Sequence, residues 1–590
     1  MFSFPRQSTV LACLLAAGCS TFERGSFQAA TEPEGASGYT AKAGWATGRY
    51  AIATANPLAT DAGYQILKSG GSAVDAAIAV QMVLTLVEPQ SSGIGGGAFL
   101  LHWDGHRVEA YDGRETAPAT ADGTLLLAAD GTPLPFLEAA IGGRAVGTPG
   151  ILKMLEMAHR EHGRLPWPKL VESAVHLAES GFRVSPRLNR LLAGESRLRT
   201  DPVARHYFYD PEGKPWPVGH LLKNPELAAL LRRIGAEGSA ALLTGAVARD
   251  IVAKVRSHPG NPGRLSEQDL AAYQPRKREP FCTLWLSYRV CGFPPPSSGA
   301  IAVAQILGIL ENLPGDRPAL EDGLPSTDFL HRYTEAARLA FADRNQYVAD
   351  PDFVAAPAGT WMSLVSPAYL RQRAELVGPR SMRTARPGTP GEVSNAWASQ
   401  PEQVEHGTSH ISIIDSTGQS VAMTTSIESA FGSRQMVRGF LLNNHLTDFS
   451  FAPSDTAGRP IANRVEAGKR PRSTMSPTLV FDQATGRLLM SVGSPGGALI
   501  AHYTAKTLLG TLAWGLDVQE AINLPNFGSV NGPTLLETKR FPASTVDALK
   551  ARGHEIREIS MVSGVQAIQR TYAGYFGGAD PRREGEVMGE

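Results

Sequence analysis

Cysteine is scarce in this chain, and no metal-binding pattern uses it. Four cysteines occur among 590 residues, and neither a CxxC pair nor a Cys/His spacing typical of zinc ligands is present. The run HREH at 159–162 is not the HExxH pattern of zinc hydrolases, and histidines at that helical spacing are more often solvated than bound to metal. The sequence therefore predicts no metal.

Two cysteines remain once the amino-terminal Cys13 and Cys19 are set aside. Cys282 and Cys291 lie in PFCTLWLSYRVCGFPPP, two strand-like runs that would fold back near Leu286-Ser287. The turn has no Asn-Gly type signal. A disulfide between them is predicted if the chain enters an oxidising compartment.

An excess of either charge is also missing. Lys plus Arg number 56 and Asp plus Glu number 56, so the formal net charge is zero and no basic block follows a phosphate backbone. Nucleic acid is therefore not expected as a partner. A hydrophobic content of 43%, with 61 glycines and 42 prolines, is typical of a loop-rich globular enzyme. The length predicts about three to five units, or one large layered domain with insertions.

No apolar run is long enough to span a membrane. STVLACLLAAG follows Arg6 and is far shorter than the ~20 residues of a spanning helix, which is typical of an export signal. LLAAGCS also resembles a lipoprotein signal, with cleavage before Cys19 and acylation of its thiol; the alternative is a soluble export signal cut nearby. Residues 1–19 are predicted to be the signal and 20–44 a polar tether. The mature protein is then periplasmic, and any membrane contact is through a lipid anchor.

Periodicity predicts alternating helical and extended segments. Residues 57–87 predict two helices divided at Gly70-Gly71, the second apolar almost all round and buried between layers. Residues 145–235 and 299–348 predict further helices. Residues 377–407 lose the periodicity and gain Pro, Gly and Ser, which predicts a mobile connector. Buried helices beside strands predict an α/β sandwich.

A β-hairpin is predicted immediately after this connector. TSHISIID alternates, STGQ supplies a turn, and SVAMTTSIES alternates again. Its polar face includes Ser426 and Glu428, a hydroxyl and a carboxylate two residues apart, beside the strand that begins at Thr408.

The Gly407-Thr408 bond is a candidate cut site. A threonine hydroxyl needs a base, and cleavage before Thr408 would create an α-amino group, with a pKa of about 7.7–8.0, in the same residue. Gly407 has no side chain to hinder attack on its carbonyl. The alternative is an ordinary strand threonine, which is the default for an isolated Gly-Thr.

The segments around this site resemble the γ-glutamyltransferase family, the glutathione hydrolases and transpeptidases among the N-terminal nucleophile hydrolases. TSHISIIDSTGQSVAMTTSIESAFG matches the family signature. Further matches follow in one order from about residue 45 onward: GGSAVDAAIAVQMVLTLVEPQSSGIGGGAFLL, YDGRETAP, FPPPSSG, EAARLAFADR, LLNNHLTDFS, KRPRSTMSPT and GSPGG.

The resemblance implies a four-layer αββα fold, self-cleaved into a large subunit, 45–407, and a small catalytic subunit, 408–590. It implies that Thr408 attacks a γ-amide carbonyl of glutathione or a similar compound. Water or an amino-acid amine then resolves the γ-glutamyl-enzyme, without a cofactor. Ser426 matches a second hydroxyl residue, usually threonine, that bonds to the nucleophile.

The resemblance also implies an oxyanion hole and a substrate clamp. Gly496 and Gly497 match the backbone donors to the oxyanion. Arg114 matches the arginine that binds the substrate α-carboxylate, which its guanidinium fork suits. The resemblance implies that Ser473 and Thr474 also donate to this carboxylate. It implies that Asp448 accepts the substrate α-ammonium.

Three departures from the family pattern leave the donor open. Glu428 stands where asparagine is best known, His445 where Gln or Glu is usual, and the segment 450–469 is shorter than the lid loop of some members. The glutamate could pair with the α-ammonium. A more open site would favour hydrolysis or admit other acyl groups, as in the related cephalosporin acylases. An acylase and a non-catalytic binding lipoprotein are the two alternatives.

The glycine run GIGGG at 93–97 is not a dinucleotide-binding motif, because a helix precedes it and a strand follows. A tight packing loop is predicted instead.

Overall fold

A computed structural model describes residues 36, 38–315, 318–392, 397–401, 403, 405 and 407–590. The predicted signal 1–19, with Cys19, and most of the predicted tether lie outside the described residues.

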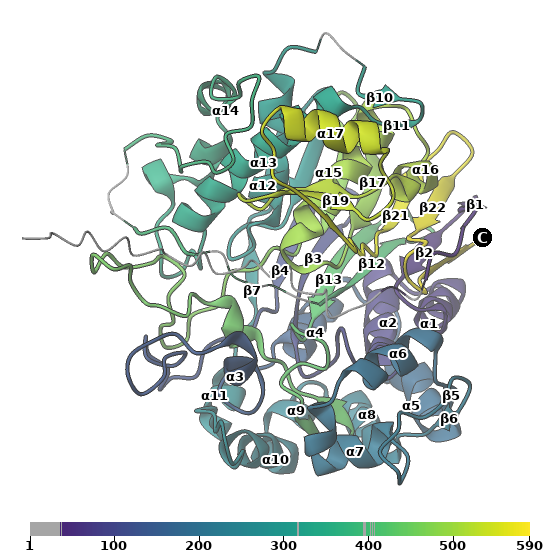
Figure 1. Ribbon diagram of the computed structural model, residues 1–590. Coiled ribbons are helices and arrows are strands. Elements are labelled where there is room, and N and C mark those ends of the chain that lie inside the picture. Colours follow the sequence, from purple (N-terminus) through teal and green to yellow (C-terminus); the bar gives the residue numbers. More distant parts are fainter. Residues whose placement is uncertain are drawn as a thin grey trace, which may run out of the picture. The chain divides into compact units, whose positions relative to one another are not determined.

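Two seven-stranded antiparallel sheets form the centre of the described chain (Figure 1). The first sheet has the order β1 (Trp45–Thr47), β22 (Tyr575–Ala579), β21 (Gln566–Arg570), β17 (Leu488–Gly493), β16 (Thr478–Asp482), β9 (Tyr288–Gly292), β8 (Phe281–Trp285). The second has the order β23 (Glu586–Gly589), β2 (Ala51–Thr54), β12 (Ser409–Ile414), β13 (Ser420–Ser426), β3 (Gly97–Trp103), β4 (Val108–Asp112), β7 (Arg276–Arg278).

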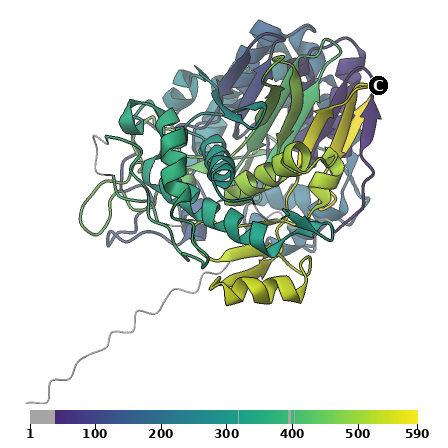
Figure 2. The ribbon, with the colours of Figure 1, turned by 90° about the horizontal axis from the view of Figure 1, so that it is seen from above.

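The two sheets pack face to face and helices cover both outer faces, which gives four layers (Figure 2). Apolar side chains of both inner faces, such as Phe99 and Leu101 from one sheet and Leu479 and Phe481 from the other, form one core cluster. The helices on the first sheet are α12 (Gly299–Glu311), α13 (Thr327–Tyr347), α15 (Ile500–Leu508) and α16 (Val518–Asn523). Those on the second are α1 (Pro57–Lys68) and α2 (Ala73–Val87). The αββα prediction is confirmed.

The predicted division at Gly70-Gly71 is confirmed, and its cause is local. Gly70 adopts φ 85°, which ends α1, and Ser72 begins α2 with a capping box to Asp75. All of α2 is buried, because it lies between the second sheet and outer helices. Of these outer helices, α4 (Ile151–His162) and α5 (Glu172–Ser180) contact α2 directly. The same region of the chain also contains α6 (Pro186–Gly194), α7 (Pro202–Phe208), α8 (Pro225–Glu237), α9 (Ala240–Leu243), α10 (Gly245–Arg256) and α11 (Glu267–Ala272).

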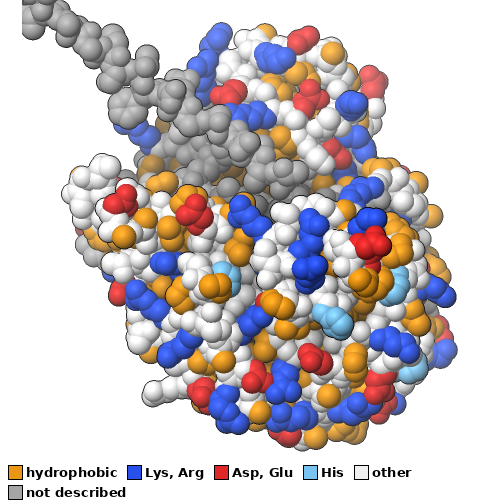
Figure 3. Space-filling model, turned by 60° about the horizontal axis from the view of Figure 1, so that its bottom comes forward, with side chains coloured by type: hydrophobic (Ala, Val, Ile, Leu, Met, Phe, Trp, Pro, Cys, Tyr) orange, Lys and Arg blue, Asp and Glu red, His pale blue; other side chains and the backbone are white. Residues whose placement is uncertain are grey.

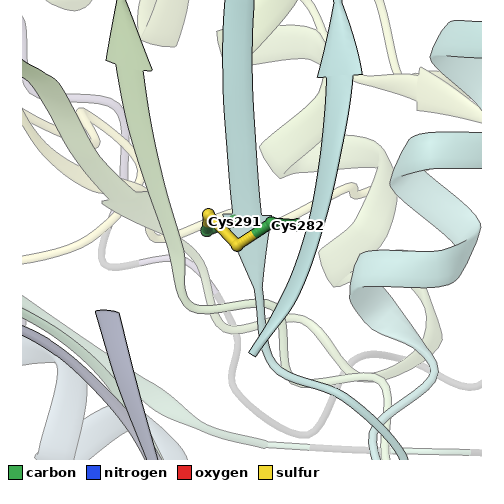
Figure 4. The surroundings of a disulfide bond; sticks show 2 residues. All are labelled: Cys282 and Cys291. Atoms are coloured by element: carbon green, nitrogen blue, oxygen red, sulfur yellow. A yellow bond between two sulfur atoms is a disulfide. The ribbon is translucent and has the colours of Figure 1, made fainter. Parts of the chain in front are cut away.

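Cys282 and Cys291 are joined by a disulfide between β8 and β9 (Figure 4). They stand directly opposite each other in the antiparallel register. The two-residue loop Leu286-Ser287 turns with Leu286 at φ 52°, a left-handed conformation that the missing Asn-Gly signal did not indicate.

The predicted hairpin is confirmed as β12 and β13, two central strands of the second sheet. Their register pairs Ser409 with Thr425, so Thr408 and Ser426 lie at the same end. The glycine run packs against this end, as predicted: a Cβ on Gly96 would lie 2.1 Å from the carbonyl oxygen of Ser426. Close backbone packing thus fixes the end of the hairpin.

The surface offers no large area of one charge on the face shown in Figure 3, where basic and acidic side chains are interspersed. Within the described ranges, no helix has the length and apolar character needed to cross a membrane.

Candidate active site

The peptide bond between Gly407 and Thr408 lies at the buried end of the hairpin. Thr408 is 2% exposed and directly precedes β12. Its Oγ1 donates a hydrogen bond of 2.5 Å to the carbonyl oxygen of Gly407. The hydroxyl predicted to attack this carbonyl is therefore already in contact with it.

A second hydroxyl contacts the same carbonyl. Ser426 ends β13, and its Oγ donates to the Gly407 oxygen over 2.7 Å. The backbone N–H of Glu428 donates to Ser426 Oγ over 2.8 Å, and His445 Nε2 lies 3.1 Å from the same oxygen. The register of two adjacent strands thus places Ser426 at the predicted cut site.

Gly496 and Gly497 lie in the loop between β17 and α15, with φ of 132° and 54°. Both angles favour glycine, and a Cβ on Gly496 would lie 2.4 Å from the ring of Tyr503. Gly497 lines the cavity at Thr408. The role of the Gly496 and Gly497 backbone N–H groups as oxyanion donors stays a prediction.

Arg114 is fully buried and holds Asp448. Its Nη2 bonds to Asp448 Oδ2, and Nε donates to the carbonyl oxygen of Pro471 over 3.2 Å. Burial raises the pKa of Asp448 and Arg114 opposes this. Asp448 Oδ1 has no hydrogen-bond partner among the described residues.

Glu405, from the predicted connector, places its carboxylate between Thr474 and Arg344. Thr474 Oγ1 donates to Glu405 Oε2 over 2.6 Å, and Arg344 Nη2 bonds to Glu405 Oε1. Arg344 Nη2 also donates to Thr474 Oγ1 over 2.6 Å. Burial alone would raise the pKa of Glu405, but Arg344 and then Arg472 hold it below its usual range. Ser473 Oγ instead accepts from the N–H of Met475 at 3.1 Å.

Glu428 lies behind the site and does not line the cavity. It adopts φ 78°, unusual for a residue with a side chain, and its carboxylate accepts from Asn444 Nδ2. Burial, followed by the nearby charge of Asp448, raises its pKa well above the usual range. Asp448 and Glu428 are therefore two buried acids whose negative charges would repel each other at this end of the site.

The cavity at Thr408 is almost filled. Its volume is about 10 Å³, at the lower limit for one water molecule. It is lined by Arg114, Glu405, Thr408, Ser426, His445, Asp448, Ser473, Thr474, Met475, Gly497 and Ile500.

Two groups of side chains elsewhere have ligand atoms close enough for a metal ion: His102, Glu109, His162 and His331, Glu335, His554. In the first group, Lys277 Nζ lies 2.9 Å from Glu109 Oε1, so a cation already neutralises the carboxylate. In the second, His331 and His554 bond to each other over 2.7 Å, and the remaining ring nitrogens bond to Gly378 O and Thr534 Oγ1. We assign a metal to neither group.

Sequence reasoning missed three contributors to this site. Arg344 lies in the quoted run EAARLAFADR and Glu405 in EHG, yet their contact joins residues distant in the chain. Glu115 directly follows Arg114, and its Oε1 lies 2.8 Å from His445 Nδ1. Of the three, only Glu405 gave a signal in the sequence, as an acidic residue two positions before the predicted cut after Gly407.

The paired sheets between helical layers, with a threonine at the head of a central strand and hydroxyls on the preceding carbonyl, define an N-terminal nucleophile hydrolase. The chain belongs to the gamma-glutamyltranspeptidase family, whose pattern matches residues 59–590. It is an enzyme of that family.

Its relatives include hydrolases and acylases. The glutathione hydrolase proenzyme of Bacillus subtilis strain 168 is 32% identical over 552 residues, 91% of each chain. The acylase ACY 1 proenzyme of Pseudomonas sp. strain V22 is 33% identical over 534 residues, 89% of this chain and 90% of the relative. The crystal structure of a cephalosporin acylase from Bacillus halodurans superposes with a TM-score of 0.81 at 27% identity, covering 93% of this chain and 97% of that one. Family membership alone does not select the acyl group.

Proposed function

We propose that this chain cuts itself before Thr408 and then acts as a γ-glutamyl hydrolase and transpeptidase on glutathione and related amides. Thr408 Oγ1 bonds to the γ-carbonyl carbon and the amide C–N bond breaks. The α-amino group of Thr408 takes the hydroxyl proton and passes it to the departing nitrogen. Water or an acceptor amine then attacks the γ-glutamyl ester and restores the hydroxyl.

The observation that carries this proposal is the buried acid pair Asp448 and Glu428. Each acid is desolvated, and the charge of Asp448 raises the pKa of Glu428. Arg114 engages Asp448 Oδ2, and the other oxygen of this carboxylate has no partner among the described residues. A substrate α-ammonium would donate to this oxygen and add a second positive charge beside Asp448. A γ-glutamyl group carries that ammonium, whereas a glutaryl group does not.

The contact of Glu405 supports a carboxylate on the same acyl group. Arg344 and Thr474 hold its carboxylate beside the cut site. Removal of Glu405 after cleavage would leave this pair for the substrate α-carboxylate. The proposal therefore adds Arg344 to the carboxylate subsite implied at Arg114, Ser473 and Thr474.

The donor preference is directly measurable. The mature enzyme should release p-nitroaniline from a γ-glutamyl anilide with a kcat/KM about 10-fold or more above that for the glutaryl anilide, since a charged hydrogen bond contributes about 1.5–3 kcal/mol. The glutaryl acylase is the second candidate, favoured by the similarity to the acylases. A preference for the glutaryl anilide would replace the γ-glutamyl proposal with it.

Arg344→Leu should weaken donor binding specifically. We expect KM for the γ-glutamyl anilide to rise about 10- to 100-fold, because one charge-assisted contact with the α-carboxylate is lost. The kcat should change much less, since the guanidinium is not placed on the reacting carbonyl. Steady-state kinetics of the mature variant test this, with the exposed Arg438→Leu as a matched control. An unchanged KM in Arg344→Leu would remove Arg344 from the subsite.

A further inference from the structure

An acid close to the predicted cut is bound inside the site. Glu405 lies two positions before Gly407 and lines the same cavity as Thr408. Its carboxylate accepts a hydrogen bond of 2.6 Å from Thr474 Oγ1 and bonds to Arg344 Nη2. These two contacts fix the chain just before the Gly407-Thr408 bond.

The guanidinium that binds this carboxylate is itself held by several contacts. Arg344 Nε donates to Ser298 Oγ over 2.8 Å, and Nη1 donates to Asn345 Oδ1 over 3.0 Å. Nη2 donates to Thr474 Oγ1 over 2.6 Å in addition to its bond with Glu405. Ser298 is buried at the start of α12. A planar guanidinium fixed in this way offers an acid one defined position.

Charge favours an acid at this position. Arg114 contacts one acid, Asp448, and Glu405 is the acid in contact with Arg344. Burial, and then the charge of Arg344, lowers the pKa of Arg472 to about 9, and Glu405 opposes this lowering. A neutral side chain at position 405 would leave the buried charge of Arg344 without this partner, which is costly.

The bound acid and the carbonyl at the predicted cut belong to one short segment. One residue separates Glu405 from Gly407, so their Cα atoms lie at most about 7 Å apart. The carbonyl oxygen of Gly407 accepts hydrogen bonds from Thr408 Oγ1 over 2.5 Å and from Ser426 Oγ over 2.7 Å. Because the link is short, fixing the carboxylate restricts where the carbonyl can lie, and such restriction favours attack by a neighbouring group.

We propose that Glu405 is a positioning residue for self-cleavage: its carboxylate, bound to Arg344 and Thr474, holds the Gly407 carbonyl at Thr408. The chain thereby uses its own acid in the place that the substrate α-carboxylate is proposed to take later. This inference rests on the proposed self-cleavage before Thr408. It gives Arg344 a role in maturation as well as in donor binding.

The chemical step needs only groups of the chain and water. Thr408 Oγ1 bonds to the Gly407 carbonyl carbon, and negative charge develops on the oxygen that Ser426 contacts. The C–N bond then breaks, and the proton lost by the hydroxyl is taken by the nitrogen of Thr408. The resulting ester between Gly407 and Thr408 is hydrolysed by one water molecule. Glu405 takes up no proton and forms no bond; it keeps the carbonyl within reach of the hydroxyl.

Glu405→Gln removes the charge and keeps the size of the side chain. The full chain would be made by cell-free synthesis, and its cleavage would be followed on denaturing gels. We expect self-cleavage to slow about 10- to 100-fold, because a charge-assisted hydrogen bond that holds the reacting geometry is lost. Glu392→Gln, at an exposed acid of the same connector, is the matched control and should cut at the wild-type rate. Wild-type cleavage in Glu405→Gln would overturn the proposal.

Arg344→Leu, alone and combined with Glu405→Gln, tests whether the two residues act through their contact. The single variant should also slow self-cleavage, because Glu405 loses its partner. The double variant should cut no more slowly than the slower single variant, whereas independent effects would multiply. Multiplied effects would contradict a shared positioning role. Circular dichroism of each uncut chain checks folding. If either of these variants fails to fold, Thr474→Val removes only the hydroxyl that donates to Glu405, and its cleavage should still slow several-fold; wild-type cleavage there would contradict the role as well.

Added acetate separates positioning from simple neutralisation of Arg344. In Glu405→Ala, a free carboxylate can neutralise the guanidinium, but it is not linked to the Gly407 carbonyl. We therefore expect acetate to leave the slow cleavage of this variant unchanged, and recovery of the wild-type rate would overturn the proposal. A wild type that never cuts sinks the proposed function itself, whereas wild-type cutting with unaltered variants sinks only the role of Glu405. The matured fraction of Arg344→Leu, once separated from uncut chain, still serves for the measurement of donor binding.

Discussion

Thr408→Ala should remain a single uncut chain without amidase activity. The methyl group cannot attack the Gly407 carbonyl, which the wild-type hydroxyl contacts at 2.5 Å. Without a cut, no α-amino group is generated at residue 408, and the connector with Glu405 stays on Arg344 and Thr474. Nucleophile, base and substrate space are lost together, so we expect activity to fall at least about 10³-fold.

Intact mass and amino-terminal sequencing of each fragment test this result. Wild type should give two chains, one beginning at Thr408, and Thr408→Ser should also cut because it retains a hydroxyl. The serine variant is the matched control, since both variants remove the same methyl branch. Cutting of Thr408→Ala at the same bond would show that another group performs the cleavage.

The elements around the site were predictable because their patterns are local. The hairpin follows from strict alternation on either side of STGQ, and α2 from an apolar run that begins at a capping serine. The order of strands in the two sheets was not predictable in this way, because β2, β12 and β3 come from distant parts of the chain. The turn at Leu286 shows the same limit, since strand pairing and the disulfide override a poor turn sequence.

The site likewise has a part that motifs predict and a part that they do not. Thr408, Ser426, Gly497 and Asp448 were placed together from motifs, and all four line one cavity. Side-chain direction was less accessible: Arg114 bonds to Asp448, while Arg344 binds the carboxylate that stands at Thr474. These directions depend on which buried charges neutralise each other after folding, and no local pattern specifies that.

Because the ends of strands β12 and β13 lie side by side, the Gly407 carbonyl can serve as the substrate of the proposed self-cleavage. Gly407 is the last residue of the predicted connector, and its carbonyl oxygen accepts hydrogen bonds from Thr408 and Ser426, where the amide of the proposed donor would stand. The same hydroxyl of Ser426 can therefore act first on the chain and then on the substrate. A change at Ser426 should affect maturation and turnover alike.

Ser426→Ala should slow self-cleavage about 10²- to 10³-fold, because it removes a donor to the Gly407 oxygen, and one such donor contributes about 2.7–4 kcal/mol to the barrier. Ser426→Thr should cut near the wild-type rate, since it keeps the hydroxyl in the same register opposite Gly97. The rates are read from the appearance of the fragment that begins at Thr408. Equal rates in the alanine and threonine variants would mean that the 2.7 Å contact does not stabilise the developing oxyanion. The donor would then have to be sought in the Gly496-Gly497 loop, whose backbone reaches the same cavity from the other sheet through Gly497.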